Sequence, residues 1–212
     1  MGPKIVDKET KRREIYQAAM ELFARKGVPR TTIREIAENA GIGKGTVYEY
    51  FGSKKEILAA SFEYMLEETE QYMAREMQKS PRDPLHQLRA FFHGLVNYLE
   101  SVPRHVTEML LVFWAEGILE HSPADPNAAF GELDLEDMYR QYIDSLAGIL
   151  RRGKQEGVFR ATLAERELAS ALVGVLDGLL LQWMMFQEGI DLRQTIDRFL
   201  ESVLEGILET EA

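Results

Sequence analysis

The sequence contains no cysteine among its 212 residues. This absence excludes a disulfide framework and a thiolate metal site, and it is compatible with a reducing cytoplasm. The most apolar stretch, 172–186, is interrupted by Asp177 and Gln182 and is too short to span a bilayer. The first 14 residues are charged and lack an apolar segment, and Val6 stands where a myristoylation signal needs Ser or Thr. We therefore expect a cytoplasmic protein.

Motifs of common enzymes are missing as well. The glycine-rich segment 41–46 fails the phosphate-loop pattern because a glycine follows its lysine and Glu38 stands at the earlier glycine position. There is no nucleophile elbow, and no histidine belongs to an H-E-x-x-H or Glu-x-x-His motif. The histidines are His86, His93, His105 and His121. We expect no enzyme, no cofactor and no metal site.

Basic residues are scarce outside the N-terminal quarter, and the net charge is −10. Residues 1–56 hold 12 Lys/Arg and 8 Asp/Glu, which gives +4, whereas the remainder holds 13 and 27, which gives −14. A basic module on an acidic body is expected if only one end of the chain meets nucleic acid.

The stretch 31–58 carries the clearest local signals. Thr32 and Glu35 have the spacing of a capping box, so a helix is predicted to start there. Its apolar stripe follows at i, i+3, i+4 and i+7: Ile33, Ile36, Ala37 and Ala40. The break at 41–43 suits glycine, and a second short helix is predicted from about Lys44 to Tyr50. Two short helices around a glycine-bearing turn indicate a helix-turn-helix.

The second of these helices has one apolar side, formed by Val47 and Phe51 one turn apart, with Tyr50 beside them. The outward side carries small and polar groups: Gly45, Thr46, Tyr48 and Glu49, with Lys44 at the helix start. Such a face suits a DNA groove, since Gly45 permits close backbone approach and the other groups can reach bases or phosphates. Glu49 would repel phosphates unless it accepts a hydrogen bond from a cytosine amino group.

The pattern T-T-I-R-E-I-A-x-x-A-G-I-x-K-G-T-V-Y-x-Y-F-x-S-K-x-x-I-L resembles the DNA-binding domain of the tetracycline-repressor (TetR) family. The resemblance covers about the first quarter of the chain. It implies that Arg34, Lys44, Thr46 and Tyr48 contact bases or nearby backbone, and that phosphates are held by Thr32, Tyr50 and Lys54. Gly43 departs from the family, which often has serine there.

Upstream, a helix is predicted from about Glu9 to Lys26. Lys11, Arg12 and Arg13 stand at its start, where the helix dipole disfavours cations. They form either a solvated charge run or an arm that touches phosphate.

Downstream, a long helix is predicted from Ser53 to about Lys79, and three more between 84 and 157. Their aromatic and methionine side chains either pack a plain core or line an apolar cavity. The resemblance favours the cavity, because TetR-family proteins hold an effector between the corresponding helices. The predicted effector residues are Phe91, Leu95, Tyr98, Met109, Phe113, Trp114, Met138, Tyr142, Leu146 and Leu176.

Thr162 and Glu165 have capping-box spacing before a penultimate helix, and Asp191 precedes the last one. The penultimate helix is apolar on more than one face, which favours a four-helix dimer interface over burial within one chain. The predicted interface residues are Leu172, Leu179, Trp183, Phe199, Leu200, Val203, Leu204 and Ile207. Asp177 within this helix fits either an effector pocket or the dimer seam.

These observations predict an all-α protein of about nine helices, with a three-helix DNA-binding domain (1–52) and a larger domain (53–212) for effector binding and dimerisation. The predicted function is a ligand-responsive transcriptional regulator, with a repressor favoured. It would bind a palindromic double-stranded operator as a homodimer and be released by an apolar or aromatic small molecule. The alternatives are a helical small-molecule-binding protein or enzyme with a structural helix-turn-helix, and a ligand-independent DNA-binding activator.

Overall fold

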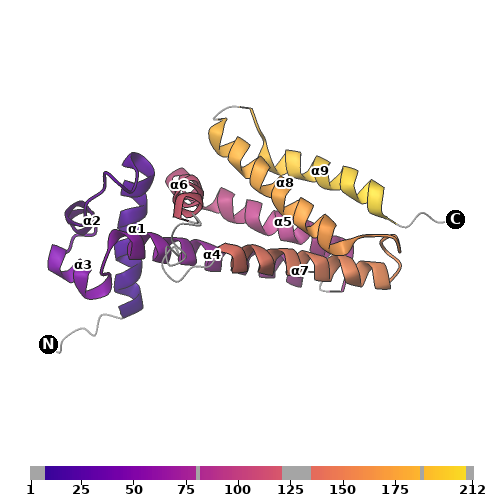
Figure 1. Cartoon of the computed structure of the whole chain (residues 1–212), viewed down its shortest axis with the longest axis horizontal. Helices are drawn as coiled ribbons and strands as arrows, with labels where there is room; N and C mark the ends of the chain where they lie inside the picture. Colours follow the sequence, from indigo (N-terminus) through magenta and orange to yellow (C-terminus); the bar gives the residue numbers. More distant parts are fainter. Residues whose placement is uncertain (1–7, 80–81, 121–134, 187–188, 209–212) are drawn as a thin grey trace. The chain divides into compact units, whose positions relative to one another are not determined.

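The computed structural model describes residues 8–79, 82–120, 135–186 and 189–208, apart from the side chains of 105 and 114–120. Across these residues the elements are helices, and the only strand-like pairing is an isolated bridge between Phe159 and Leu208. The predicted all-α class is confirmed. The helices, labelled in Figure 1, are α1 (Lys8–Lys26), α2 (Ile33–Asn39), α3 (Lys44–Tyr50), α4 (Lys54–Gln78), α5 (Pro84–Ser101), α6 (Arg104–Glu120), α7 (Leu135–Gln155), α8 (Glu165–Met185) and α9 (Leu192–Ile207).

The helices form two compact units. Unit 1 comprises the described residues of 1–66 and 102–134, and unit 2 comprises those of 67–101 and 135–212. The helix α4 is continuous and contributes residues to both units. This structural division differs from the predicted functional boundary after residue 52, which stays a prediction.

Unit 1 is built around α1, which packs against α2 and α6. Its core contains aliphatic and aromatic side chains that are almost fully buried: Ile15, Ala19, Phe23, Ile36, Val47, Phe51, Ile57 and Leu58. Of these, Ile36, Val47 and Phe51 are residues that the helical spacing predicted on the apolar faces of α2 and α3. On α4, Phe62 stacks on Phe113 of α6 with the rings within 4° of parallel.

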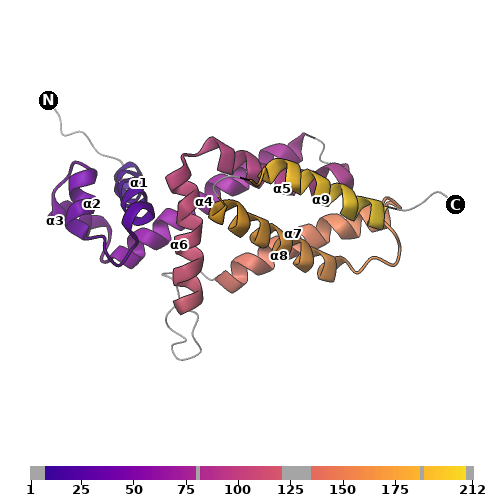
Figure 2. The same cartoon turned by 90° about the horizontal axis from the view of Figure 1, so that it is seen from above.

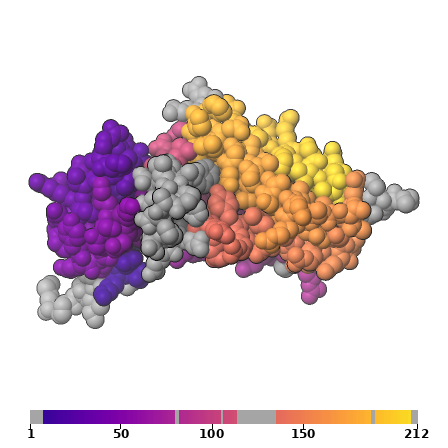
Figure 3. Space-filling view, in the orientation of Figure 1, coloured from indigo at the N-terminus to yellow at the C-terminus, as the bar shows by residue number. Residues whose placement is uncertain are grey.

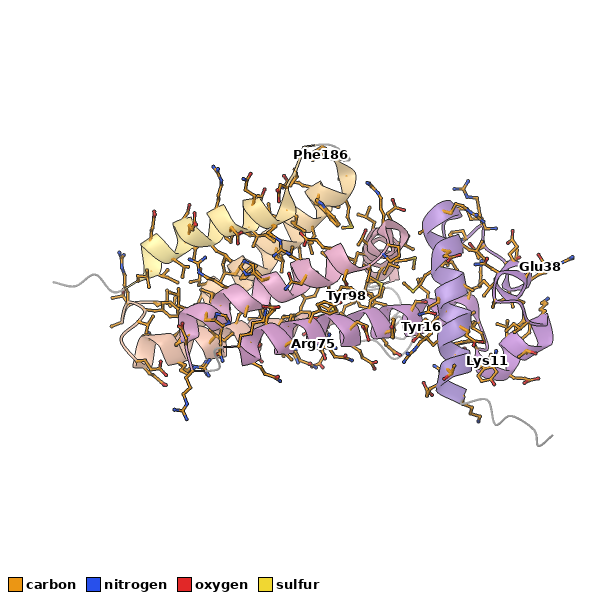
Figure 4. All side chains as sticks on the ribbon, turned by 180° about the vertical axis from the view of Figure 1, so that it is seen from behind. Lys11, Tyr16, Glu38, Arg75, Tyr98 and Phe186 are labelled. Atoms are coloured by element: carbon orange, nitrogen blue, oxygen red, sulfur yellow. The ribbon has the colours of Figure 1, made fainter. Side chains whose placement is uncertain are left out.

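Unit 2 is a helical bundle in which α7 packs against α5 and α8, and α9 packs against α5 and α8. Figure 2 shows α5 beside α9 and α7 beside α8. The close approach of α5 to α4 depends on Gly94, since a Cβ built there would lie 2.4 Å from the Cα atom of Met73. One turn further along α5, Tyr98 lies against Tyr72 of α4 with ring centroids 5.8 Å apart (Figure 4).

Helix starts agree with two of the three capping signals described above, at Thr32 and at Asp191. Thr32 and Glu35 form the full capping box of α2, and the Asp191 side chain accepts from the Gln194 amide at 2.9 Å. The hydroxyl of Ser53 accepts from the Glu56 amide, and Asp83 accepts from the Leu85 amide. The capping box predicted at Thr162 and Glu165 is wrong.

The helix α8 instead begins after Ala164, which makes no side-chain capping bond. The carboxylate of Glu165 is engaged by the ammonium group of Lys154 on α7, at 3.0 Å. This bond is the largest influence on the pKa of Glu165, which it lowers. A tertiary ion pair therefore takes the place of the local cap.

Candidate nucleic-acid interface and effector-binding unit

The turn between α2 and α3 is closed by backbone hydrogen bonds. The backbone of Gly41 adopts a left-handed conformation (φ +67°), which residues other than glycine rarely adopt. The Ile42 amide then donates to the Ala37 carbonyl at 2.9 Å, and α3 starts after Gly43 with no side-chain cap. This geometry fixes α3 relative to α2, as a helix-turn-helix requires.

Polar contacts hold α2 against α1. The Asn39 side chain donates to the carbonyl of Ala18 at 2.9 Å, and the ammonium of Lys26 pairs with Glu35 at 2.5 Å. Donation from Lys26, and then from Thr32, lowers the pKa of Glu35 to about 2. The capping carboxylate therefore stays ionised at all physiological pH values.

The helix α3 turns one face inward and presents the other to solvent. Val47 is fully buried and Phe51 is 2% exposed, whereas the ring of Tyr48 is 50% exposed. Lys44, Gly45 and Glu49 are exposed, and Thr46 is half-buried. A Cβ built on Gly45 would meet no atom within 4 Å, so the backbone is open to a close partner. The ammonium of Lys44 lies 5.6 Å from the centroid of the Tyr48 ring.

The remaining residues of the predicted DNA site already have partners within unit 1. The ammonium of Lys54 donates to the carbonyls of Val28 (2.8 Å), Pro29 (3.2 Å) and Thr31 (2.6 Å). The Thr32 hydroxyl caps α2 by accepting a hydrogen bond from the Glu35 amide. The exposed guanidinium of Arg34 pairs with Glu38 at 2.8 Å. The ring of Tyr50 is half-buried. Of the predicted DNA-site residues, three are therefore exposed on α3 (Lys44, Gly45 and Tyr48) and two at α2 (Thr32 and Arg34), whereas Lys54 bonds inside the unit.

The basic residues at the start of α1 also have intramolecular contacts. Lys11 pairs with Glu14. The guanidinium of Arg12 donates to the Tyr50 carbonyl at 3.2 Å, at the C-terminal end of α3, and lies 4.6 Å from the Phe51 ring centroid. Arg13 lies over the ring of Tyr64 at 5.3 Å. A cation at a helix C-terminus is favourable, so Arg12 helps to hold α3 in place.

The predicted effector residues fall in both units. In unit 2, Phe91, Tyr98, Leu146 and Leu176 are buried, and three are half-buried: Leu95, Met138 and Tyr142. In unit 1, Met109 and Phe113 are buried, and the Trp114 side chain lies outside the described residues. A surface depression on α9 is lined by charged and polar residues that include none of the ten: Asp191, Arg193, Gln194, Asp197, Arg198 and Glu201.

Polar groups lie among the apolar side chains of unit 2. The half-buried carboxylate of Asp177 on α8 is hydrogen-bonded to Tyr139 of α7, and burial raises its pKa to about 6. Burial, together with the charge of Glu70, raises the pKa of Tyr142 to about 12. The Tyr142 ring meets Phe91 edge-on, with centroids 6.1 Å apart. Asp177 therefore faces α7 within unit 2.

The predicted dimer residues divide between the interior and the surface of unit 2. Four of them are buried within the chain: Leu172, Leu200, Leu204 and Ile207. Four are half-buried: Leu179, Trp183, Phe199 and Val203. The exposed apolar side chains of α8 were not among the predicted residues. They are Val175, Leu181 and Met185, with Phe186 just beyond the helix (Figure 4).

Family models match most of the chain. Residues 15–61 match the bacterial regulatory proteins of the tetR family, and residues 84–205 match the C-terminal domain of BetI-type transcriptional repressors. The second match alone covers more than half of the chain.

The chain belongs to the TetR family of transcriptional regulators.

Curated relatives of this regulator match along nearly its full length. It is 28% identical to the HTH-type transcriptional regulator TtgR of Pseudomonas putida, over 92% of this chain and 90% of TtgR. It is 26% identical to BetI of Burkholderia cenocepacia, over 92% of each chain. The regulator is thus a helix-turn-helix DNA-binding protein.

Solved structures share the fold. NalD, the secondary repressor of the MexAB-OprM multidrug efflux pump in Pseudomonas aeruginosa, aligns with a TM-score of 0.69 at 21% identity, over 97% of this chain and all of NalD. A transcriptional regulator from Saccharomonospora viridis in complex with choline aligns with a TM-score of 0.68 at 26% identity, over 95% of this chain and all of that one.

By length and composition, α8 of the regulator is apolar enough to cross a membrane, with a mean hydropathy of 1.6 in its most apolar window. One such helix is weak evidence, because core and interface helices of soluble proteins pass the same test. Within the described residues a third of that window is buried, and apolar side chains of α8 such as Leu181 and Met185 are exposed.

Proposed function

We propose that this regulator is a cytoplasmic homodimeric repressor without catalytic activity. In this proposal α3 enters the major groove of a palindromic operator, and an apolar or aromatic small molecule bound in the helical body releases the DNA. The observation that carries the proposal is the exposed face of α3, where Lys44, Gly45 and Tyr48 are presented by a helix whose other face is fully buried.

Because Lys44, Gly45 and Tyr48 are exposed, they do not pack in the core of unit 1 and are available to contact DNA. The Tyr48 phenol can bond a base edge or a phosphate, and the open backbone at Gly45 lets α3 approach the groove floor. Glu49 is also exposed and matches the amino group of a cytosine. These contacts would read sequence, whereas Lys44 would supply the sequence-independent attraction.

We test this role with Tyr48→Ala in the full-length protein and with duplexes taken from the DNA upstream of its own gene. We expect about a tenfold or greater loss of operator affinity, with a much smaller change for a scrambled duplex, because a base contact contributes about 1–3 kcal/mol of discrimination. The control is Arg140→Ala, an exposed residue of α7 in unit 2. Equal losses on operator and scrambled DNA would count against base readout by α3.

A palindromic operator requires two copies of α3 about 34 Å apart, and therefore a dimer. The surface proposed for dimerisation follows α8 at alternating steps of three and four residues: Ala171, Gly174, Gly178, Leu181 and Met185. A Cβ built on Gly174 or Gly178 would meet no atom within 4 Å, so a second helix can approach closely there. On α9, the half-buried Phe199 and Val203 and the exposed Gly206 continue the surface. Figure 3 shows α8 and α9 side by side.

A second copy of the chain is the occupant that fits this surface. It is an exposed apolar stripe on a helix whose opposite side is already buried, and monomers rarely leave such a stripe in water. Paired across a two-fold axis, α8 and α9 of each chain would form a four-helix interface.

We test dimerisation with Leu181→Glu, which places a carboxylate in the middle of the stripe. Sedimentation velocity should show a dimer for the native protein and for the control Gln155→Glu on exposed α7 surface, and a monomer for Leu181→Glu. The monomeric variant should also bind the operator at least about tenfold more weakly, because a lone subunit loses the second half-site. A monomeric native protein at micromolar concentration would refute the dimer.

Release by an effector needs a path between the body and the DNA-binding helices. The continuous helix α4 starts in unit 1 and ends in unit 2, so a ligand that favours one position of α4 would bias the spacing of the two α3 helices. Operator and effector would then weaken each other's binding by the same factor. Thermal-shift screening of metabolites, followed by operator release, tests this step, because a true effector raises the melting temperature by mass action.

A further inference from the structure

An exposed ion pair lies on the outward face of α2. The guanidinium of Arg34 donates from its Nε atom to the carboxylate of Glu38, one helical turn further along, at 2.8 Å. The two side chains are 79% and 62% exposed, against 24% and 40% for the pair Lys26–Glu35 between α1 and α2. Solvent and salt screen an exposed pair, so little free energy is needed to separate Arg34 from Glu38.

The helix dipole does not favour this pair. In α2, which has 7 residues, Arg34 lies in the first turn and Glu38 in the last turn. A cation near the N-terminus of a helix and an anion near its C-terminus are both placed against the dipole. The start of α2 is already capped by Thr32 and Glu35. Stabilisation of α2 therefore does not account for a carboxylate at position 38.

The exposed face of α2 is the one that would meet the DNA backbone. In a docked helix-turn-helix, the first helix crosses the backbone while the second enters the major groove. Thr32, Arg34 and Glu38 are exposed, whereas Ile36 and Ala37 on the other face of α2 are buried. Glu38 lies on the side of α2 that faces away from α1 (Figure 4). A guanidinium binds carboxylate and phosphate oxygens through the same N–H groups, so Glu38 and a phosphate are alternative partners of Arg34.

Other cations of unit 1 have partners that they could not exchange in this way. The part-buried bonds of Lys54 to the carbonyls of Val28 and Thr31 join α4 to the loop before α2. The part-buried bond of Arg12 to the Tyr50 carbonyl joins α1 to α3. By contrast, the bond between Arg34 and Glu38 stays within one helix, so breaking it leaves the packing of α1, α2 and α3 intact.

We propose that Glu38 is an intramolecular competitor of DNA, whose carboxylate holds Arg34 in the free protein and releases it when Arg34 binds a phosphate. This inference rests on the proposed DNA-binding function of unit 1. The released carboxylate stays close to the phosphates, where it retains a cation that would otherwise leave on binding. Glu38 thus weakens binding to any duplex and reduces its salt dependence, which makes the DNA easier to release.

The test measures binding of the full-length protein to an operator duplex and to a scrambled duplex at several salt concentrations. Glu38→Gln removes the charge and keeps the length of the side chain. We expect it to bind both duplexes at least about threefold more tightly at low salt, with a salt slope steeper by up to about one per subunit. The matched control is Glu108→Gln on α6, because Glu108 accepts from Arg104 at 3.0 Å in another i, i+4 pair of unit 1. The control should leave affinity and slope unchanged.

A second measurement separates competition from direct repulsion between Glu38 and the phosphates. In a protein that already carries Arg34→Gln, Glu38→Gln should lose most of its effect, because no guanidinium remains to be released. Glu38→Ala is an independent variant, since alanine also removes the carboxylate and is a good helix former. It should give the same gain in affinity. Neither Glu38 variant should lower the melting temperature, because an anion near the C-terminus of α2 does not stabilise that helix.

An unchanged affinity and salt slope in both Glu38 variants would overturn the competition. It would also be overturned by an equal gain in the Arg34→Gln background, which would indicate direct repulsion, or by an equal gain in Glu108→Gln, which would indicate a general charge effect. If Tyr48→Ala removes the operator preference while the Glu38 variants change nothing, the proposed function stands and only the competition fails. If neither the native protein nor its Glu38 variants bind either duplex, both fail.

Discussion

Lys54 offers a direct test of how the DNA-binding unit is held together. The family resemblance predicts that this lysine holds a phosphate, but its ammonium group donates to the carbonyls of Val28, Pro29 and Thr31, 23 to 26 residues earlier in the chain. These carbonyls belong to the loop between α1 and α2. Lys54→Met keeps the aliphatic stem and removes the charge, so it tests the bonds without emptying the space.

The size of the effect follows from the bonds that are lost. A hydrogen bond to a charged donor contributes about 1.5–3 kcal/mol net. The two shorter bonds, at 2.6 Å to Thr31 and 2.8 Å to Val28, are part-buried, and the third, at 3.2 Å to Pro29, is exposed. The three share one ammonium group and their acceptors regain some water, so the contributions are not additive. We expect a loss of about 2–3 kcal/mol, or about 5–10 °C in melting temperature.

The assay pairs thermal unfolding with hydrogen exchange and with operator binding at several salt concentrations. Lys54→Met should lower the melting temperature and increase amide exchange in the loop between α1 and α2. Its operator affinity should fall without a change in the salt slope. Lys44→Met is the counterpart, because Lys44 is exposed on α3. It should leave stability within about 0.5 kcal/mol and reduce the salt slope by about one per subunit.

The reverse pattern would refute a structural role for the Lys54 ammonium. If Lys54→Met leaves the melting temperature and loop exchange unchanged and reduces the salt slope, then Lys54 reaches phosphate in the complex and its carbonyl contacts contribute little. If both variants lower stability equally, the distinction between a bonded and an exposed lysine fails.

Two further predictions concern stability. Gly94→Ala should destabilise the protein by about 1–3 kcal/mol in urea unfolding, because its Cβ would lie 2.4 Å from the Cα of Met73. The control is Gly148→Ala on α7, which should be neutral or stabilising because a Cβ there meets nothing within 4 Å. Equal effects of the two substitutions would contradict the close approach of α5 to α4. Glu35 has a pKa lowered to about 2, so its stabilising effect is present above its unfolded value near 4.5 and is lost as pH falls toward 2. Glu35→Gln should therefore flatten the decline in melting temperature between about pH 5 and about pH 2, and an unchanged decline would contradict the assignment.

The helix-turn-helix could be predicted from the sequence almost residue by residue. Its signals are local: the Thr32–Glu35 capping box, the left-handed Gly41 and the apolar Val47 and Phe51 act within one or two turns of the chain. Such features depend on residues that are close together in the sequence, so the sequence alone predicts them. The start of α8 was predicted wrongly because a distant partner, Lys154, took the carboxylate that the local pattern assigned to a cap.

The two faces of α8 could not be told apart from its sequence. Both are apolar, so periodicity alone does not say which residues pack on α7 and α9 and which remain for another chain. The predicted interface therefore included Leu172 and Leu200, which are buried within the monomer, and omitted the exposed Leu181 and Met185. Only the packing of unit 2 assigns each side chain to one face.

The basic charge of the N-terminal quarter also overstates how many cationic side chains are available to contact DNA. A composition counts every cation equally, but several cations of unit 1 have partners within the unit. Arg12 donates to the last carbonyl of α3, Lys26 pairs with the capping carboxylate of α2, and Lys54 donates to carbonyls of the loop between α1 and α2. These cations stabilise the presentation of α3 and do not lie on its outward face. The residues whose charge stabilises the module and the residues proposed to contact phosphate are therefore largely different, and Lys44, exposed at the start of α3, is the clearest member of the second group.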